Sequence, residues 1–287
     1  MLTELLQTLI FGLATAGVIA VGAVGLTLSY GVTRFVNFSY GELLTVGAYA
    51  TFVLVHSGLP LAPAAALSAV LVGLLGVLVA RVFYDPLREW GAFPLLITSI
   101  GVAFIIQNLL RMGFGSDPKR FPLPPMRPWH FGPLYIPKAQ AIILVVALGT
   151  MLLIHLLLTY TLLGKMMRAA SDNPVLARVS GINPQNISRV TWFVSSTIAG
   201  LAGVLLAITQ VAIQPAMGWS FLLVIFAATL LGGIGRPYGA MLGALFVGLG
   251  IELGTAYIAA NYTYAFAFII LVAVLVFRPQ GIMGGIE

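Results

Sequence analysis

The chain has 287 residues, of which 60% are hydrophobic and only 8% are charged, and its mean hydropathy is +1.05. Soluble domains carry roughly 25% charged residues, so this composition excludes a soluble globular protein. It indicates an all-α polytopic membrane protein. The net charge of +6 is not a nucleic-acid signal, because basic residues in a membrane protein mark its cytoplasmic side and contact anionic lipid headgroups. The absence of cysteine excludes disulfides and cysteine-bound metals.

Apolar stretches long enough to cross a bilayer recur along the whole chain. A helix needs about 20 apolar residues to span the hydrocarbon core. The run 219–231 is shorter and would be about 20 Å long as a helix; it is predicted either to cross with the help of its neighbours or to be a re-entrant half-helix. The chain is therefore predicted to be a single transmembrane domain, 1–287, with about eight or nine transmembrane helices. The full-length runs lie near 5–30, 38–56, 61–83, 93–112, 139–161, 190–213, 237–256 and 262–278.

Lysine and arginine predict the orientation. With nine crossings and the N-terminus outside, one side collects nine basic residues and the other side collects five, which are Arg111, at the end of the fourth span, and four residues of the loop 113–138. Cytoplasmic loops carry the excess of lysine and arginine, so the C-terminus and the loop 163–189 are predicted to be cytoplasmic. The nine are Arg34, Arg81, Arg88, Lys165, Arg168, Arg178, Arg189, Arg236 and Arg278.

The cytoplasmic loop contains a short capped helix. Asp172 or Asn173 can cap its N-terminus, and Pro174 suits the first helical position. The following VLARVS gives about two turns, and Gly181 fits a left-handed stop. A helix this short is not stable alone in water, so either the membrane surface or a partner protein is expected to hold it.

A second polar feature begins the second span. Ser39 and Glu42 have the spacing of a capping box, and the Glu42 carboxylate would suit the positive end of the helix. An ionisable group near the membrane is also a candidate for a pathway or gating role, and Asn37 and Ser39 would then line the same break. Thr98 and Ser99, in the middle of the fourth span, either bond to neighbouring helices or line a pathway.

Glycines interrupt the apolar segments near the C-terminus. A tight break between two short helices is predicted there, and the small residues at spacing four beyond it favour close helix packing. Glu252 lies deepest in the predicted spans, and a paired or outward-pointing carboxylate is preferred over a substrate ligand. The residues of the break are Gly232, Gly233, Gly235, Pro237 and Gly239.

The outer loop 113–138 is rich in proline, basic and aromatic residues. It is predicted to be either a docking surface or a cap anchored in lipid headgroups. No phosphate-binding Gly-Lys-Ser/Thr loop, metal-binding His-Glu-x-x-His or Gly-x-Ser-x-Gly occurs in the sequence. The chain is therefore not expected to hydrolyse ATP, to be an enzyme, or to hold a metal or cofactor.

Three stretches together resemble a known family. NFSYGELLTVGAY (37–49), RAASDNPVLARVSGIN (168–183) and FRPQGIMG (277–284) are similar to LivH-like permease subunits of ABC importers for branched-chain, or hydrophobic, amino acids. The pattern extends over nearly the whole chain. It departs from the broader ABC importer pattern where Arg168-Ala169-Ala170 replaces Glu-Ala-Ala.

The resemblance implies a multi-pass protein of the bacterial inner membrane that works by alternating access. Its partners would be a second homologous permease subunit, two ATP-binding subunits on the cytoplasmic side, and an extracytoplasmic substrate-binding protein, for which 113–138 is a candidate dock. Urea, amides or aromatic acids are alternative substrates within the family, and a stand-alone channel or ion-coupled carrier is a lower-ranked alternative. The resemblance assigns coupling to the ATPase to Asp172, Asn173, Pro174, Val175, Leu176, Arg178, Val179 and Gly181.

Overall fold

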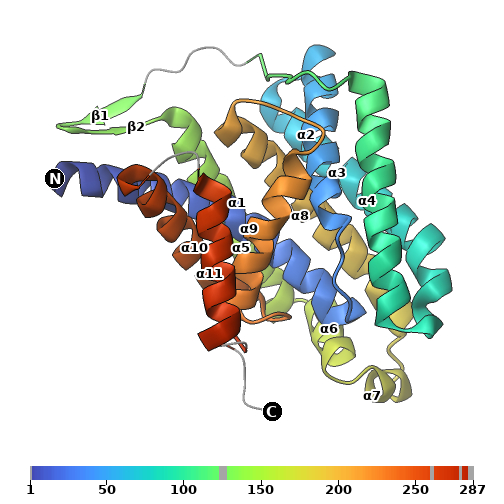
Figure 1. The fold of residues 1–287 in the computed structure, drawn as a ribbon. Coiled ribbons are helices and arrows are strands. Elements are labelled where there is room, and N and C mark those ends of the chain that lie inside the picture. Colours follow the sequence, from blue (N-terminus) through green and yellow to red (C-terminus); the bar gives the residue numbers. More distant parts are fainter. Residues whose placement is uncertain (1, 123–127, 259–261, 278–279, 284–287) are drawn as a thin grey trace.

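The computed structural model describes residues 2–122, 128–258, 262–277 and 280–283. The described chain is a helical bundle with one short β-hairpin (Figure 1), and the predicted all-α class is confirmed. Residues 123–127 of the predicted outer loop 113–138, and Arg278 of the predicted cytoplasmic set, lie outside the described residues. The helices are α1 (Leu2–Thr33), α2 (Tyr40–His56), α3 (Leu61–Val79), α4 (Ala92–Phe114), α5 (Lys138–Tyr160), α6 (Leu162–Asp172), α7 (Pro174–Val179), α8 (Pro184–Gln210), α9 (Met217–Gly232), α10 (Pro237–Tyr257) and α11 (Thr263–Phe277).

Six helices in the described ranges have the length and composition to cross a membrane, namely α1, α3, α4, α5, α8 and α10. The short run predicted at 219–231 is the 16-residue helix α9. The largest differences from the predicted ends are at α3 and α8. A π-helical turn, η1 (Ala80–Tyr84), and a 3₁₀ turn, η2 (Asp85–Trp90), prolong α3. Helix α8 begins earlier than predicted, because the Asn183 side chain caps it.

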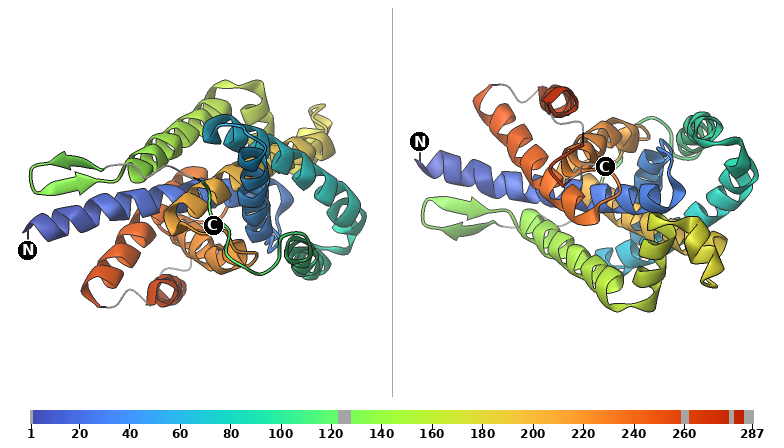
Figure 2. Two further views of the ribbon diagram at one scale, coloured as in Figure 1. Left: turned by 90° about the horizontal axis from the view of Figure 1, so that it is seen from above. Right: turned by 90° about the horizontal axis from the view of Figure 1, so that it is seen from below.

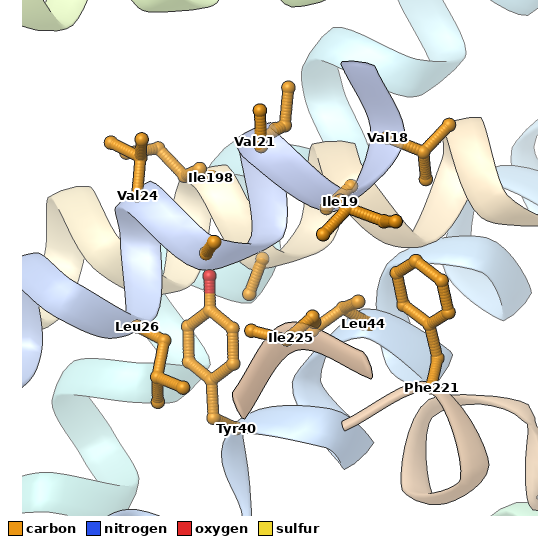
Figure 3. Packing of buried hydrophobic residues seen from close by; sticks show 14 of the residues in the cluster. Val18, Ile19, Val21, Val24, Leu26, Tyr40, Leu44, Ile198, Phe221 and Ile225 are labelled. Carbon is orange, nitrogen blue, oxygen red and sulfur yellow. The ribbon is translucent and has the colours of Figure 1, made fainter. Parts of the chain in front are cut away.

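Helix α1 lies at the centre of the bundle, between α5 and α10 (Figure 2). Its buried face joins the largest hydrophobic cluster, part of which is drawn in Figure 3. Small residues allow this close packing. A Cβ added to Gly22 would lie 2.7 Å from the Cδ1 atom of Ile225, and one added to Gly248 would lie 2.5 Å from the Cα atom of Ala16. Substituting Gly248 would therefore push α10 away from α1, whereas a side chain at Gly22 would first displace the side chain of Ile225.

Helix α2 begins inside the bundle. The segment 34–39 is irregular and leads from the end of α1 to Tyr40, whose hydroxyl donates a 2.9 Å hydrogen bond to the carbonyl oxygen of Gly22, well within α1. The next residue, Gly41, packs on the first turn of α9, where an added Cβ would lie 2.6 Å from the Gly218 carbonyl oxygen. Irregular backbone inside a membrane protein persists only when it is buried in protein or lines a wet cavity.

The loops gather at two ends of the bundle. At one end, here called the coupling end, Arg34 donates a hydrogen bond to the carbonyl oxygen of Ser171, and Arg236 donates one to that of Met283. This end therefore joins the α1–α2 connection, the α6–α7 segment, the α9–α10 turn and the C-terminal segment. It lies at the bottom of Figure 1.

The opposite end, here called the hairpin end, carries the N-terminus and the antiparallel hairpin of β1 (Trp129–Phe131) and β2 (Leu134–Ile136). Gln7 bonds to the backbone of Tyr135 through both its amide nitrogen, at 2.7 Å, and its amide oxygen, at 3.0 Å. Lys119 and Ile213 exchange backbone hydrogen bonds of 2.9 and 2.8 Å, which join the loop after α4 to the loop after α8. The predicted outer loop thus has fixed attachments on two sides.

Candidate coupling surface and translocation site

Helix α6 is an amphipathic helix that the sequence analysis did not separate from the loop. The Thr161 hydroxyl caps it by accepting a 3.1 Å hydrogen bond from the backbone nitrogen of Gly164. Gly164, Met167 and Ala170 form its buried face. These small or apolar residues recur every three positions, and this spacing is the pattern in the sequence that could have predicted the helix. The result is a helix that packs one face on the bundle at the coupling end.

Two hydrogen bonds attach the end of α6 to α1. The Ser171 hydroxyl donates a 2.7 Å bond to the carbonyl oxygen of Gly31, and the Arg34 guanidinium donates to the carbonyl oxygen of Ser171. The accepting carbonyls, of Gly31 and Ser171, lie in the last turns of α1 and α6, where helical carbonyls lack intrahelical donors. If α6 moves, either these two hydrogen bonds break or the end of α1 moves with it.

Helix α7 has the predicted caps. Of the two candidate caps, Asn173 is the one used: its side-chain oxygen accepts from the backbone nitrogens of Val175, at 3.1 Å, and Leu176, at 2.9 Å. Asp172 is instead the last residue of α6. Pro174 is the first residue of α7, and Gly181 has the predicted left-handed backbone, with φ +83°.

The outer face of α7 exposes aliphatic side chains. Val175 is 73% exposed, Leu176 62% and Val179 80%, whereas Ala177 is buried against the bundle. Arg178 and Gly181 border a hollow beside the helix. An exposed aliphatic patch on a six-residue helix is typical of a surface that a partner protein covers.

A buried polar cluster holds the irregular segment before α2. The Asn37 side-chain oxygen accepts from the Ser39 backbone nitrogen, at 3.0 Å, the Ser39 hydroxyl, at 2.8 Å, and the Tyr84 hydroxyl, at 3.2 Å. The Ser99 hydroxyl accepts from the backbone nitrogen of Phe38 at 3.1 Å. Asn37, Ser39 and Ser99 are thus brought together by contacts from α4 and η1. Tyr84 is a member of the site that the sequence analysis missed.

The predicted capping box between Ser39 and Glu42 is wrong. Ser39 precedes α2 with helical backbone angles and makes no side-chain cap, because its hydroxyl is bonded to Asn37 and Tyr84. Glu42 does lie in the first turn of α2 and is fully buried. One carboxylate oxygen accepts a 3.3 Å hydrogen bond from Gln107 of α4, and the other has no partner among the described residues.

Aromatic side chains gather where the segment before α2, α4 and α9 meet. The ring centroids of Phe104 and Trp219 lie 5.6 Å apart, and Phe38 lies 6.3 Å from Trp219 and 5.5 Å from Phe226. Phe104 is half exposed. Phe104 precedes Gln107 by three residues on α4, so these two side chains lie near the same face of that helix. The half-buried Thr98 makes no hydrogen bond to the cluster within the described part of the chain.

At the predicted break between the last spans, α9 and α10 pack closely against each other at two glycines. Gly233 and Gly235 have φ of +101° and +85°, and Pro237 is the first residue of α10. A Cβ on either Gly232 or Gly239 would collide with the backbone of the other. The C-terminal segment closes over this turn through a 2.7 Å bond from the Ile282 nitrogen to the Leu231 oxygen.

Glu252 is half-buried in α10, and its carboxylate has a hydrogen-bonding partner, as expected for a paired carboxylate. The Thr15 hydroxyl of α1 lies 3.5 Å from one of its oxygens. Helices α1 and α10 pack along much of their length, so this contact belongs to their interface and not to the polar cluster at the start of α2.

The chain is therefore a helical membrane protein with an irregular, polar-lined entry to α2 and an exposed aliphatic helix at one end. It belongs to the family described as branched-chain amino acid transport system / permease component, which matches residues 8–275. The expected family is thus confirmed.

Named relatives cover nearly the whole chain. It is 32% identical over 97% of its length to the high-affinity branched-chain amino acid transport system permease protein BraD of Pseudomonas aeruginosa, and covers 95% of that protein. It is 29% identical to LivH of Escherichia coli, again over 97% of this chain and 95% of the relative. A solved chain of PsaBC from Streptococcus pneumoniae in complex with Fab shares the fold, with a TM-score of 0.50, 16% identity, and coverage of 96% and 92%.

Proposed function

We propose that this chain is a membrane permease subunit of an ABC importer that moves branched-chain or other hydrophobic amino acids across the bacterial inner membrane. The observation that carries the proposal is α7, a rigidly capped helix that presents Val175, Leu176 and Val179 to the surroundings. Full-length relatives named as branched-chain amino acid permeases support the substrate class.

ATP-binding subunits are the proposed partners of α7. The sequence has no phosphate-binding loop, so the energy source acts from outside the chain. Asp172, Asn173, Pro174 and Gly181 would fix the shape of the coupling helix, the three aliphatic side chains would enter a cleft on the ATPase, and Arg178 would contact its rim. Hydrogen bonds from the end of α6 to α1 provide a route from this cleft into the bundle.

We infer nine crossings with the N-terminus outside. Helices α1, α2, α3, α4, α5, α8, α9, α10 and α11 then alternate between the two ends, and the coupling end is cytoplasmic. The gathering of Arg34, Arg168, Arg178 and Arg236 at the coupling end supports this orientation. The substrate-binding protein would dock at the hairpin end, on or beside the loop 113–138.

The polar cluster at the start of α2 is the proposed translocation or gating site. Asn37, Ser39, Glu42 and Ser99 would control its opening. The Phe104 side of α4 would face the second permease subunit and the pathway, because Asn108 is exposed on this helix, and a polar side chain facing lipid is unfavourable. Thr98 on the same helix would face the pathway once the second subunit is present.

Reconstitution tests this function. Liposomes carrying the chain, a second permease subunit and the ATPase subunits should accumulate labelled leucine when the binding protein and ATP are supplied. Replacing ATP with a non-hydrolysable analogue should abolish accumulation, and labelled urea should serve as the substrate control. Leucine transport by the lone chain without ATP would instead establish a channel or carrier.

A further inference from the structure

A cavity lies under α6 and is separate from the polar cluster at the start of α2. It has a volume of about 110 Å³. Its floor is the C-terminal part of α1, its roof is α6, and the start of α10 forms one wall. The apolar part of the lining consists of Leu28, Val32, Leu158 and Met167. Figure 2 shows α1 running between α5 and α10, the two helices that flank this space.

The cavity shares Arg168, Ser171 and Tyr238 with a wider hollow of about 550 Å³. That hollow is lined by charged groups of both signs: Arg168 and Arg236 carry positive charge and Asp172 carries negative charge. Arg236 also donates a hydrogen bond to the carbonyl oxygen of Met283. The smaller, mostly apolar cavity thus opens into the wider hollow, which is lined by both positively and negatively charged side chains at the coupling end.

The side of the cavity between α5 and α10 is bridged. The Tyr238 hydroxyl of α10 lies 2.8 Å from the Nδ1 atom of His155 and 3.3 Å from the Thr159 hydroxyl, both on α5. A lipid chain entering between these helices would have to break the bridge. The mouth at the coupling end is therefore the more accessible route, and it favours a water-soluble ligand.

We propose that this cavity binds an aliphatic amino acid from the coupling-end side. The ligand carboxylate would pair with Arg168, its ammonium group would lie toward Asp172, and its side chain would fill the apolar space against Leu28 and Val32. Each group of the ligand thus has a complementary group on the protein. The Thr27 hydroxyl, buried at the cavity without a partner among the described residues, can turn to a carbonyl of its own helix when the space fills.

Binding there would act as product feedback, and this consequence rests on the proposed function. The ligand would contact α1, α6 and α10 at once, and Met167, Arg168 and Ser171 all belong to α6. A ligand that bridges these helices stabilises the arrangement in which α6 lies against α1. It would therefore oppose any transport step that moves α6, and a rising cytoplasmic concentration of the amino acid would slow import.

The experiment uses the complete transporter in liposomes preloaded with millimolar L-leucine, L-valine or glycine. Initial ATP-driven uptake is measured from outside. Leucine and valine inside should slow uptake, and glycine, which lacks an aliphatic side chain, should not. Arg168→Gln should require about tenfold more internal leucine for the same inhibition, because a charge-assisted contact is lost. Arg81→Gln, an exposed arginine beside α3, is the matched control and should behave like the unmodified protein.

A second variant removes the space and keeps the charges. Val32→Phe should relieve inhibition by internal leucine, whereas Val145→Phe, on the exposed face of α5, should leave it unchanged. The external leucine concentration for half-maximal uptake should be unaltered in every variant. Inhibition that is equal in all variants overturns the proposal, as does inhibition that depends on anionic lipid and not on leucine. Loss of ATP-driven uptake in the unmodified protein would instead contradict the proposed function.

Discussion

The hydroxyl of Ser171 donates a 2.7 Å hydrogen bond to the carbonyl oxygen of Gly31, 140 positions earlier in the chain. This bond joins the end of α6 to the end of α1, directly before α7 begins. It is a mechanical attachment between the surface proposed to meet the ATPase and the central helix of the bundle.

Ser171→Ala should weaken this attachment without unfolding the protein. One intramolecular hydrogen bond contributes about 1 kcal/mol net, which is small compared with the stability of a domain. We expect ATP hydrolysis to continue and the amount of leucine moved per ATP to fall. Ser57→Ala, at the exposed end of α2, is the matched control. An unchanged ratio of leucine to ATP would show that the bond does not transmit movement.

Val175→Asp should uncouple uptake from ATP hydrolysis. The side chain is 73% exposed, so the chain should fold and insert normally, but a charge in an apolar cleft would cost several kcal/mol of binding energy. Co-purification of ATPase subunits and stimulated uptake should both decrease. Val211→Asp tests the same substitution at a 65% exposed valine in the loop after α8 and should have neither effect. Normal uptake by Val175→Asp would contradict the coupling assignment.

Gln107→Leu should destabilise the protein more than the double change Glu42→Met with Gln107→Leu. The single change leaves a buried carboxylate without its 3.3 Å hydrogen-bond donor, at a cost of about 1–3 kcal/mol. The double change removes both polar groups, and apolar replacements of similar shape are better tolerated. Unfolding temperatures in detergent measure the order, and the reverse order would show that Gln107 does not satisfy Glu42. Leucine uptake by the double variant tests the pathway role separately.

Gly239→Ala should destabilise the α9–α10 crossing by several kcal/mol. Its Cβ would collide with the carbonyl group of Gly232, and closely packed backbones cannot shift cheaply. Gly149→Ala, where an added Cβ meets nothing within 4 Å, should instead stabilise α5 by about 0.5–1 kcal/mol. Thermal unfolding and yield of inserted protein measure both. Equal behaviour of the two variants would mean that α9 and α10 can separate at this crossing at little cost.

Single cysteines test the orientation, since the chain has none of its own. Ser180→Cys, directly after α7, should react with a membrane-impermeant maleimide only from the cytoplasmic side. Ser57→Cys, at the turn between α2 and α3 near the hairpin end (Figure 1), should react only from outside. Labelling of both from one side would exclude the proposed arrangement of crossings.

The apolar runs were sufficient to predict the helices of the bundle, because crossing a bilayer imposes length and composition on each helix independently of its neighbours. The caps of α7 were equally readable, since Asn173, Pro174 and Gly181 act within a few residues of the helix that they bound. Helix α6 was missed because its 11 residues are amphipathic and too short for the transmembrane criterion.

The polar contacts were not predictable to the same degree. Ser39 and Glu42 fit a local motif, but besides Asn37, which bonds to Ser39, their partners are Tyr84 and Gln107, which lie 45 and 65 positions further along the chain. Tertiary hydrogen bonds replaced the local ones because α2 begins deep in the bundle, next to α4 and η1. The same holds for Phe104 and Trp219, whose contact depends on how α4 and α9 pack.

The exposed aliphatic face of α7 also has a consequence for the life of the subunit in the cell. A copy that is not yet assembled displays Val175, Leu176 and Val179 to water, on a helix too short to be stable by itself. Proteases and chaperones act on exposed aliphatic segments of this kind. The patch would thus distinguish orphan subunits from assembled ones, and we expect the amount of this chain in the membrane to follow the supply of its ATPase partners.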